Sequence, residues 1–495
     1  MAMKSIKGMN RTASGWLGVV LLIMTVEWIG FKCLYPFADY FTDSYSYIQA
    51  AVQQEAISYR PIGYSVFLRL VHAIAASDTL VVSLQYLVVQ GASLWMVLWL
   101  RRWCGLRDRT VAILMAFLVL NPLVPYLCNY ISSDALFVGL TLVWLTVLMG
   151  WLRDPGWWRL GLQLVLLFVI FNLRYTALFY PAVAALTVLL ARRGWVMSIV
   201  GVMASVGVVI AGMIWIKTIT KRETGADLFS AFSGWQMANN ALNLYTHLPV
   251  DTVGLPTVET RELAGYVRNY FSGEKQTALN DTGTWKAGDA EKRKAPGVTT
   301  AYMWEYSSPL HRYLLGYKQR NRLDYFRAWN QVGAVFSQYG YWVARRHPGA
   351  YLYYYGWPST KTFFLPDLDV FAVYNGGNRE FDALAMGWFH YLSKRVKVYS
   401  ATMQANLMAP FPSLYLLMNI AFIGVALSFL PFAAVRERNR LFTGCFRLAS
   451  AFLLANAFFS IFASPSVLRY EVLPMIILFV FGVCTASKSR LFVVN

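Results

Sequence analysis

The stretch ALFVGLTLVWLTVLMGWL at residues 135–152 contains no charged side chain. As an α-helix of 18 residues it would rise about 27 Å, close to the ~30 Å hydrocarbon thickness of a bilayer. Of all 495 residues, 57% are hydrophobic and only 14% are charged. We therefore predict an all-α polytopic membrane protein with about ten transmembrane helices, at 14–36, 79–100, 110–127, 135–152, 160–173, 176–191, 195–216, 413–434, 441–463 and 471–487.

The net charge of +19 has a topological explanation. The short loops on one side of these segments hold 16 basic and three acidic residues, and so account for +13 of it. Such an excess marks the cytoplasmic side of a membrane protein and requires no polyanionic partner, so a nucleic-acid-binding protein is excluded. The pattern places both termini in the cytoplasm and predicts a multi-pass protein of the bacterial inner membrane, with membrane lipids as its surroundings.

Three parts of the chain are expected. Residues 1–216 form an N-terminal transmembrane module that includes a first outer segment at 37–78, and residues 412–495 form the C-terminal transmembrane helices. Between them, 217–411 has a composition near that of soluble proteins, which predicts a mixed, mainly helical extracytoplasmic domain. Within it, the stretch 271–297 is rich in Gly, Lys and Asp and is predicted to be a flexible loop.

Ionisable residues beside the apolar segments are candidates for function, because charge near hydrocarbon is costly. They gather at the outer helix ends, as a reaction at one leaflet requires, whereas a conduction pathway would distribute them across the membrane. The first outer segment contains Asp43-Ser-Tyr-Ser-Tyr47-Ile-Gln-Ala-Ala51 and then Arg60-Pro-Ile-Gly-Tyr64-Ser-Val-Phe-Leu68.

These motifs resemble the GT-C superfamily of polyprenyl-phosphate-sugar-dependent membrane glycosyltransferases, in particular the bacterial relatives of protein O-mannosyltransferase and of the lipid A aminoarabinose transferase. The family pattern Asp-Ser-x-x-Tyr-x-x-x-Ala matches Asp43 to Ala51. Its Arg-x-Pro-Gly-Tyr-Pro pattern is modified here, since proline moves to Pro61 and Ser65 stands where proline is common. Agreement extends to three further places: Ser132-Ser133-Asp134, Leu173 to Leu178, and Arg469-Tyr470 with Pro474. The resemblance covers the helical parts well and 217–411 hardly at all.

The resemblance implies transfer of a monosaccharide from a polyprenyl-phosphate donor to a glycan, lipid or protein acceptor on the periplasmic face. Asp43 would be the catalytic base, and Asp134 would assist at the acceptor. Independently of the family, such a transfer needs a carboxylate to take the acceptor proton and cations to hold the departing phosphate. Residues expected to bind substrate are Asp39, Tyr47, Arg60, Tyr64, Arg174, Arg469 and Tyr470.

Each candidate also has a purely structural interpretation. Asp134 follows two serines at a helix start, where an acid favours the helix dipole. Arg174 could reach the membrane interface by snorkelling, and Glu471 could simply neutralise Arg469. Asp39 would share a face with Asp43 if this stretch were helical, and their like charges would then raise the pKa of Asp43.

Nothing in the sequence firmly implies a cofactor. There is no Walker loop, nucleophile elbow or Rossmann fingerprint, and a divalent metal has no supporting motif. The pair Asp367-Leu-Asp369 is interpreted as a turn. Two alternatives remain: an O-antigen polymerase or ligase that uses diphosphate lipids, and a lipid or solute transporter, which broken helices paired between two halves would favour.

Overall fold

The computed structural model describes residues 2–191, 194–250, 252–280, 300–400, 402–429 and 440–488; for 2–16 and 273–280 it describes the backbone only. The regular secondary structure of these residues is helical, and their β-structure is limited to three isolated bridges. The all-α prediction is confirmed. The chain divides into two compact units, the first formed by 1–209, 368–455 and 468–495 and the second by 210–367 and 456–467.

Eight helical segments of the described residues are long and apolar enough to cross a membrane. They are Leu17–Leu34 within α1 (Ala2–Leu34), α4 (Asp78–Cys104), Asp108–Asn129 comprising α5 (Asp108–Val119) and α6 (Leu123–Asn129), α7 (Ser133–Arg153), α10 (Trp195–Thr224), Met403–Phe429 comprising α20 (Met403–Met408) and α21 (Phe411–Phe429), α23 (Arg440–Ala463) and α24 (Leu468–Lys488). The fifth and sixth predicted spans correspond to shorter apolar helices, α8 (Trp157–Leu173) and η1 (Tyr175–Phe179) with α9 (Tyr180–Leu190). Ten spans were predicted, and eight meet the length of a full crossing.

Helix boundaries in the first unit follow local capping chemistry. Ser77 Oγ accepts a hydrogen bond from the Leu80 backbone N–H at 3.2 Å and starts α4. Gly105 ends the same helix in the left-handed conformation, with φ +63°, which glycine adopts without steric cost. Ser132 caps α7 in the same way as Ser77 caps α4. These caps place the acidic residues Asp78 and Asp134 in first helical turns.

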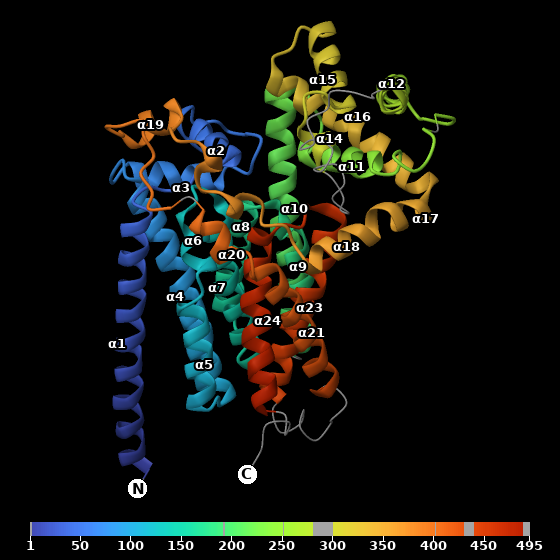
Figure 1. Cartoon of the computed structure of the whole chain (residues 1–495). Coiled ribbons are helices and arrows are strands. Elements are labelled where there is room, and N and C mark those ends of the chain that lie inside the picture. Colours follow the sequence, from blue (N-terminus) through green and yellow to red (C-terminus); the bar gives the residue numbers. More distant parts are fainter. Residues whose placement is uncertain are drawn as a thin grey trace. The chain divides into compact units, whose positions relative to one another are not determined.

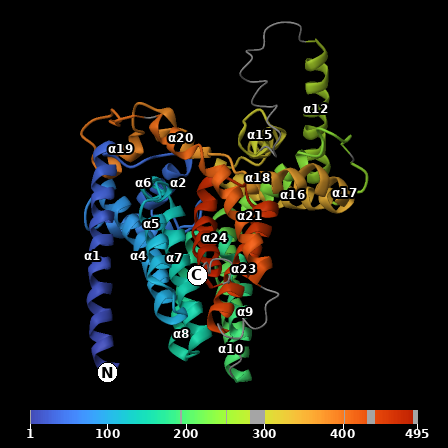
Figure 2. The same cartoon turned by 60° about the horizontal axis from the view of Figure 1, so that its bottom comes forward.

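The long helices of the first unit run side by side in both views (Figure 1, Figure 2). α1 begins and α24 ends at one end of the unit, and the short helices α2 (Thr42–Val52), α3 (Gly63–His72) and α19 (Ala383–Phe389) lie at the other (Figure 1). The starts of α7 and α24 also lie at this second end, which is where the predicted functional residues should meet.

Residues 368–408 belong to the first unit, so the compact units divide the chain differently from the predicted segment 217–411. This segment contains η3 (Asp369–Ala372), η4 (Tyr374–Gly377), α19 and α20. It is held by apolar burial, because Phe381 and Phe389 join a core cluster with Tyr40, Tyr47 and Tyr64.

The second unit is a set of helices around an aromatic core. Its helices are α11 (Ala231–Leu242), α12 (Val258–Asn280), α14 (Ala301–Trp304), α15 (Pro309–Arg320), α16 (Tyr325–Arg346), α17 (Pro348–Tyr351), η2 (Leu352–Gly356) and α18 (Trp357–Phe364). Trp235 of α11 stacks on Trp329 of α16 with ring centroids 3.8 Å apart, and Phe336 meets Trp235 edge-on. Residues 271–280 of the predicted loop are helical, and 281–297 lie outside the described residues.

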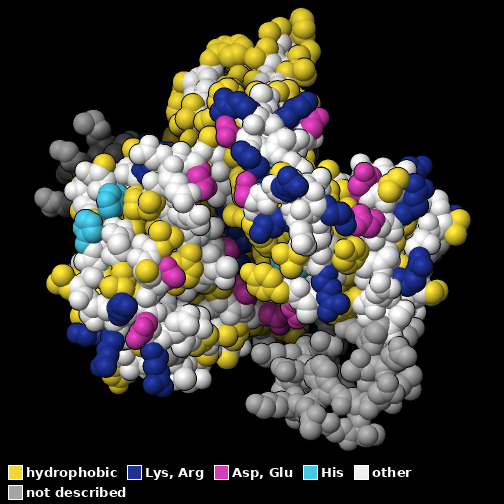
Figure 3. Space-filling view, turned by 90° about the horizontal axis from the view of Figure 1, so that it is seen from above, with side chains coloured by type: hydrophobic (Ala, Val, Ile, Leu, Met, Phe, Trp, Pro, Cys, Tyr) yellow, Lys and Arg dark blue, Asp and Glu magenta, His cyan; other side chains and the backbone are white. Residues whose placement is uncertain are grey.

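On the face shown in Figure 3, the charged side chains are mixed in sign. In the space-filling view Lys and Arg side chains are interspersed with Asp and Glu, and hydrophobic side chains reach the surface between them (Figure 3). Basic residues of the described short loops lie at or beside the end of α4, the start of α5, the end of α7, the start of α8 and the end of α24: Arg101, Arg102, Arg107, Arg109, Arg153, Arg159 and Lys488.

Phosphatase fusions can assign the sides of the membrane. Because the short basic loops mark the cytoplasmic side, alkaline phosphatase fused after residue 76, between α3 and α4, should be active, and a fusion after residue 105 should be inactive. The measurement is phosphatase activity relative to fusion-protein level. The opposite pattern would place α2 and α3 in the cytoplasm and contradict the predicted orientation.

Candidate active site

Charged side chains from separate segments of the first unit meet at the end where α2 lies. We call this group the ion cluster; it comprises Asp43, Arg60, Asp134, Arg174, Asp369 and Arg469. Five of these six residues were predicted from the sequence, and the structure brings all five together. The cluster has three positive and three negative side chains.

Asp43, in the first turn of α2, is bound by two guanidinium groups. Arg60 Nη2 lies 2.5 Å from Asp43 Oδ1, and Arg469 Nη1 lies 3.5 Å from Asp43 Oδ2. Burial alone would raise the pKa of Asp43, but the positive charges of Arg60, Arg469 and Arg174 outweigh burial and hold the pKa below its ordinary value. Asp43 is therefore a carboxylate at neutral pH, as a proton acceptor must be.

Asp134, in the first turn of α7, is the most buried acid of the cluster. It forms an ion pair with Arg174, and Asp134 Oδ2 lies 3.4 Å from Arg469 Nη1. The Ser132 hydroxyl also donates to Asp134 Oδ2 at 2.5 Å. The predicted first-turn position is confirmed, but the helix dipole is only one of several positive partners of this carboxylate.

Arg469, at the start of α24, is shared by all three acids. Besides Asp43 and Asp134, it contacts Asp369, with Nε 3.0 Å from Asp369 Oδ2. Its guanidinium carbon lies 4.6 Å from the Phe41 ring centroid and 4.7 Å from that of Tyr470. Tyr470 also lies 4.2 Å from the guanidinium carbon of Arg174.

The structure also shows the partners of Arg174 and Glu471, for which the sequence offered structural interpretations. The Arg174 guanidinium group is paired with Asp134 and packed against Tyr470, so it has protein partners at the end of α8. Glu471 does not neutralise Arg469, because it is fully buried and accepts a 2.8 Å hydrogen bond from the Tyr415 hydroxyl.

The two predicted tyrosines of the first outer segment, Tyr47 and Tyr64, form hydrogen bonds outside the ion pairs of the cluster. The Tyr47 hydroxyl lies 2.9 Å from Ser133 Oγ, beside Asp134. Tyr64 is fully buried, donates to Gln85 Oε1 at 2.7 Å and packs edge-on against the Tyr47 ring, with centroids 4.9 Å apart. Burial raises the pKa of both phenols, so both remain neutral donors. Tyr64 thus bonds to α4 rather than to the ion cluster.

Gly63 explains how the Arg-Pro-Ile-Gly-Tyr motif approaches the site. A Cβ on Gly63 would lie 2.5 Å from the carbonyl oxygen of Asn172, near the end of α8. The start of α3 can therefore approach α8 closely only without a side chain at this position. Arg174 follows directly after α8, so this contact places the two arginine-bearing segments beside each other.

Asp39 does not share a helical face with Asp43, because α2 begins only at Thr42. Asp39 instead pairs with residues 129–131 through its backbone, and its Oδ1 accepts a 2.7 Å hydrogen bond from the Asn375 N–H. Burial raises the pKa of Asp39 to about 7, although hydrogen bonds from Asn375 and other groups oppose the shift. Its observed contacts join the first outer segment to residues 374–377.

Asp369 is the member of the cluster that sequence reasoning missed. The pair Asp367-Leu-Asp369 was interpreted as a turn, and Asp369 indeed begins the 3-10 helix η3 with a left-handed backbone, φ +52°. This conformation is uncommon for an aspartate. Nothing in the local sequence signals the contact with Arg469, which lies one hundred residues further along the chain.

The described residues offer no alternative reactive centre of metal-binding type, since no group of three or more His, Cys, Asp or Glu is arranged to hold a metal ion. His247 stacks on Tyr354, and the His311 ring lies tilted against Trp235 with ring centroids 5.1 Å apart, both within the second unit. Comparisons with models of protein families, with curated proteins and with solved structures found no match to this chain.

The contacts of Asp39 predict a pH-dependent stability. A carboxyl group whose folded pKa is raised contributes stability that is fully present below its unfolded pKa, near 4, and is lost as pH rises through the folded pKa of about 7. The thermal midpoint of the protein should therefore fall as the pH rises from about 4 to about 7, and Asp39 should add no further slope above that range. Asp39→Asn mimics the protonated group and should weaken this dependence. An unchanged slope in the variant would assign the pH dependence to other groups.

Proposed function

We propose that this protein is a membrane glycosyltransferase that moves a monosaccharide from a polyprenyl-phosphate donor to an acceptor at the periplasmic face of the bacterial inner membrane. The observation that carries the proposal is the convergence of three guanidinium groups with an ionised Asp43 at one end of a unit built from membrane-length helices. The resemblance of the motifs around Asp43 and Arg60 to the GT-C superfamily supports the same function.

In the proposed reaction the acceptor hydroxyl attacks the anomeric carbon of the donor sugar. Asp43 takes the hydroxyl proton as the new carbon–oxygen bond forms. The bond from the anomeric carbon to the phosphate oxygen breaks, and its electron pair leaves with the polyprenyl phosphate. Arg60, Arg174 and Arg469 would stabilise the charge that develops on the phosphate, and planar guanidinium groups suit its geometry.

The guanidinium groups are already paired, so phosphate must displace a carboxylate. Asp369 is the acid that phosphate can displace, because its side chain is 35% exposed, compared with 13% for Asp43 and 4% for Asp134. It also occupies Nε of Arg469, whereas Asp43 and Asp134 both bind Nη1. In this proposal the donor phosphate takes the Nε side of Arg469 while the base and its neighbour stay in place.

The gathering of the charges at one end also distinguishes this function from transport. A solute pathway would distribute polar groups along the helices, whereas the cluster joins the starts of α2, α7 and α24. The diphosphate-lipid alternative shares the need for cations but does not explain the ionised Asp43 among them. An acceptor base is the feature that the proposed transfer requires.

Asp43→Asn tests the base. The reconstituted protein would be given polyprenyl-phosphate sugars extracted from bacterial membranes together with envelope acceptors, and release of polyprenyl phosphate would be followed by mass spectrometry. The variant should release product about a hundredfold more slowly or worse. It should bind polyprenyl phosphate at least as tightly, because Arg60 and Arg469 lose a competing anion. Normal turnover in a folded variant would eliminate Asp43 as the base.

Arg469→Lys and Arg174→Lys test the phosphate site. Lysine keeps the positive charge but not the planar fork, so at least one variant should bind polyprenyl phosphate more than about tenfold less tightly. Polyprenol, which lacks the phosphate, should bind equally to all forms. Arg69→Lys on α3 is the matched control, because the ion pairs of the cluster do not include Arg69. Equal, small changes at all three positions would refute the assigned phosphate site.

A further inference from the structure

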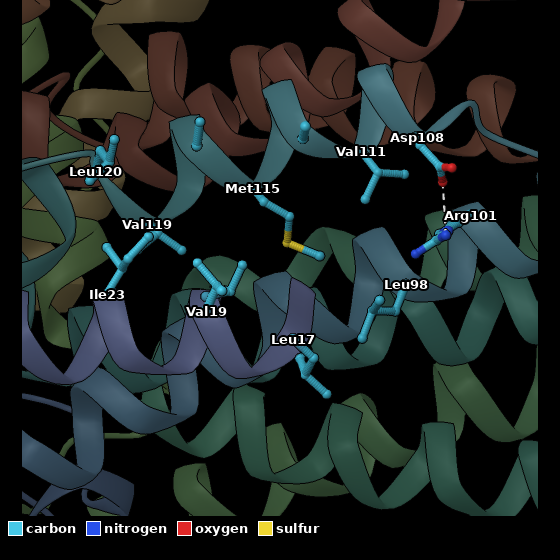
Figure 4. Close-up of a pocket in the computed structure, with 13 residues that line it drawn as sticks. Leu17, Val19, Ile23, Leu98, Arg101, Asp108, Val111, Met115, Val119 and Leu120 are labelled. Atoms are coloured by element: carbon cyan, nitrogen blue, oxygen red, sulfur yellow. Dashed lines mark hydrogen bonds and ion pairs between the residues drawn. The ribbon is translucent and has the colours of Figure 1, made fainter. Parts of the chain in front are cut away.

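A groove opens between three helices of the first unit, at the end opposite to the ion cluster. Its walls come from α1, α4 and α5, and the space between them is about 850 Å³, including its opening (Figure 4). The lining is apolar, with Leu17 and Ile23 on α1, Leu98 on α4, and Met115 on α5. Among the residues whose side chains the structure describes, the charged residues of the lining are Arg101 and Asp108, which lie together at one end (Figure 4).

Contacts of α1 explain why the groove stays open. The outer half of this helix is held by polar contacts: Trp28 Nε1 donates to Ser83 Oγ at 3.0 Å, and the Tyr86 hydroxyl donates to Glu27 at 2.6 Å. In the half that lines the groove, α1 presents apolar side chains that remain exposed, 37% for Leu17, 52% for Val19 and 39% for Ile23. Apolar walls of this kind favour an apolar occupant over water.

The dimensions suit a lipid of one leaflet. Along α5 the groove extends from Asp108 to Leu120, and these twelve steps of an α-helix rise about 18 Å. This is little more than half of the ~30 Å hydrocarbon core. One fatty acyl chain of a membrane lipid covers such a depth, whereas a spanning helix of a partner would extend well beyond it.

The charged pair indicates the headgroup. Arg101 Nη2 lies 2.8 Å from Asp108 Oδ1, and the two side chains are 22% and 82% exposed. A lipid phosphate can accept from Arg101, and a primary ammonium can donate to Asp108. An anionic headgroup without an amine would satisfy Arg101 but leave its negative charge beside Asp108.

From this complementarity we propose that the groove binds phosphatidylethanolamine, with one acyl chain between α1 and α5 and the phosphoethanolamine headgroup on Arg101 and Asp108. The site is separate from the ion cluster and does not depend on the function proposed above. The lipid would fill the space between α1 and the remaining helices and so complete the packing of α1.

Lipid retention tests the groove. The full-length protein in detergent would be exchanged with an equimolar mixture of phosphatidylethanolamine and phosphatidylglycerol, and retained lipids would be counted by native mass spectrometry. Ala116→Trp places a large side chain in the groove and should remove the retained phosphatidylethanolamine. Ile113→Trp is the matched control, since Ile113 is 45% exposed on the same helix but does not line the groove. Equal retention by the two variants would overturn the proposal.

The headgroup assignment has its own test. Asp108→Asn removes the partner of the ammonium group and should lower the preference for phosphatidylethanolamine over phosphatidylglycerol by about fivefold, the usual effect of one charge at a membrane surface. Asp154→Asn is the control, because Asp154 forms a comparable ion pair with Arg159 outside the groove, at 2.8 Å. A preference that is unchanged in Asp108→Asn, or that falls equally in both variants, would overturn the assignment.

Discussion

The pairing of Arg469 with three carboxylates is the constraint on which the rest of the site depends. Its partners come from α2, from α7 and from η3, so one side chain at the start of α24 fixes four segments that are far apart in the sequence. The positive charge of Arg60 lowers the pKa of Asp43 most, and those of Arg469 and Arg174 lower it further. The ionised state of Asp43 is therefore a property of the assembled helices rather than of α2 alone.

Such a buried ion cluster is expected to contribute little to the stability of the fold. Removing charges from water is costly, and buried ion pairs are often replaced by apolar residues without loss of stability. Apolar contacts already supply the packing around it, since Tyr47, Tyr64 and Phe381 belong to one buried core cluster. A fold that retains six charged side chains beside such a core, two of them at the starts of the membrane-length helices α7 and α24, favours a chemical role for them.

The sequence predicted the helical architecture and most of the cluster for physical reasons. Long apolar runs have few alternatives to membrane-length helices, and the alternation of loops brings the starts of α7 and α24 to the same end as α2. The unusual cost of charge near hydrocarbon then singled out Arg174 and Arg469. Between 157 and 190, where Arg174 divides the apolar run, the predicted segments 160–173 and 176–191 correspond to apolar helices shorter than a full crossing.

Contacts that depend on the path of an irregular segment could not be predicted from the sequence. Asp369 reaches Arg469 because residues 368–408 are drawn to the first unit by Phe381 and Phe389, and no local pattern encodes that path. The position of Asp39 depends on the same irregular segment, because its carboxylate accepts a hydrogen bond from the Asn375 N–H instead of sharing a helical face with Asp43.

The balance of charge in the cluster bears on how a substrate would be recognised. Three guanidinium groups facing three carboxylates leave no excess positive charge, so the site would not concentrate anions indiscriminately. The net binding free energy of an incoming phosphate is the difference between its contact with Arg469 and that of the carboxylate it replaces. A planar contact through two hydrogen bonds to Arg469 binds more strongly than a contact through one charge alone. Because Asp369 is held by the irregular segment 368–408 and is the most exposed acid, it can move without disturbing Asp43 or Asp134. Selectivity for phosphate and protection of the base would thus follow from the same arrangement.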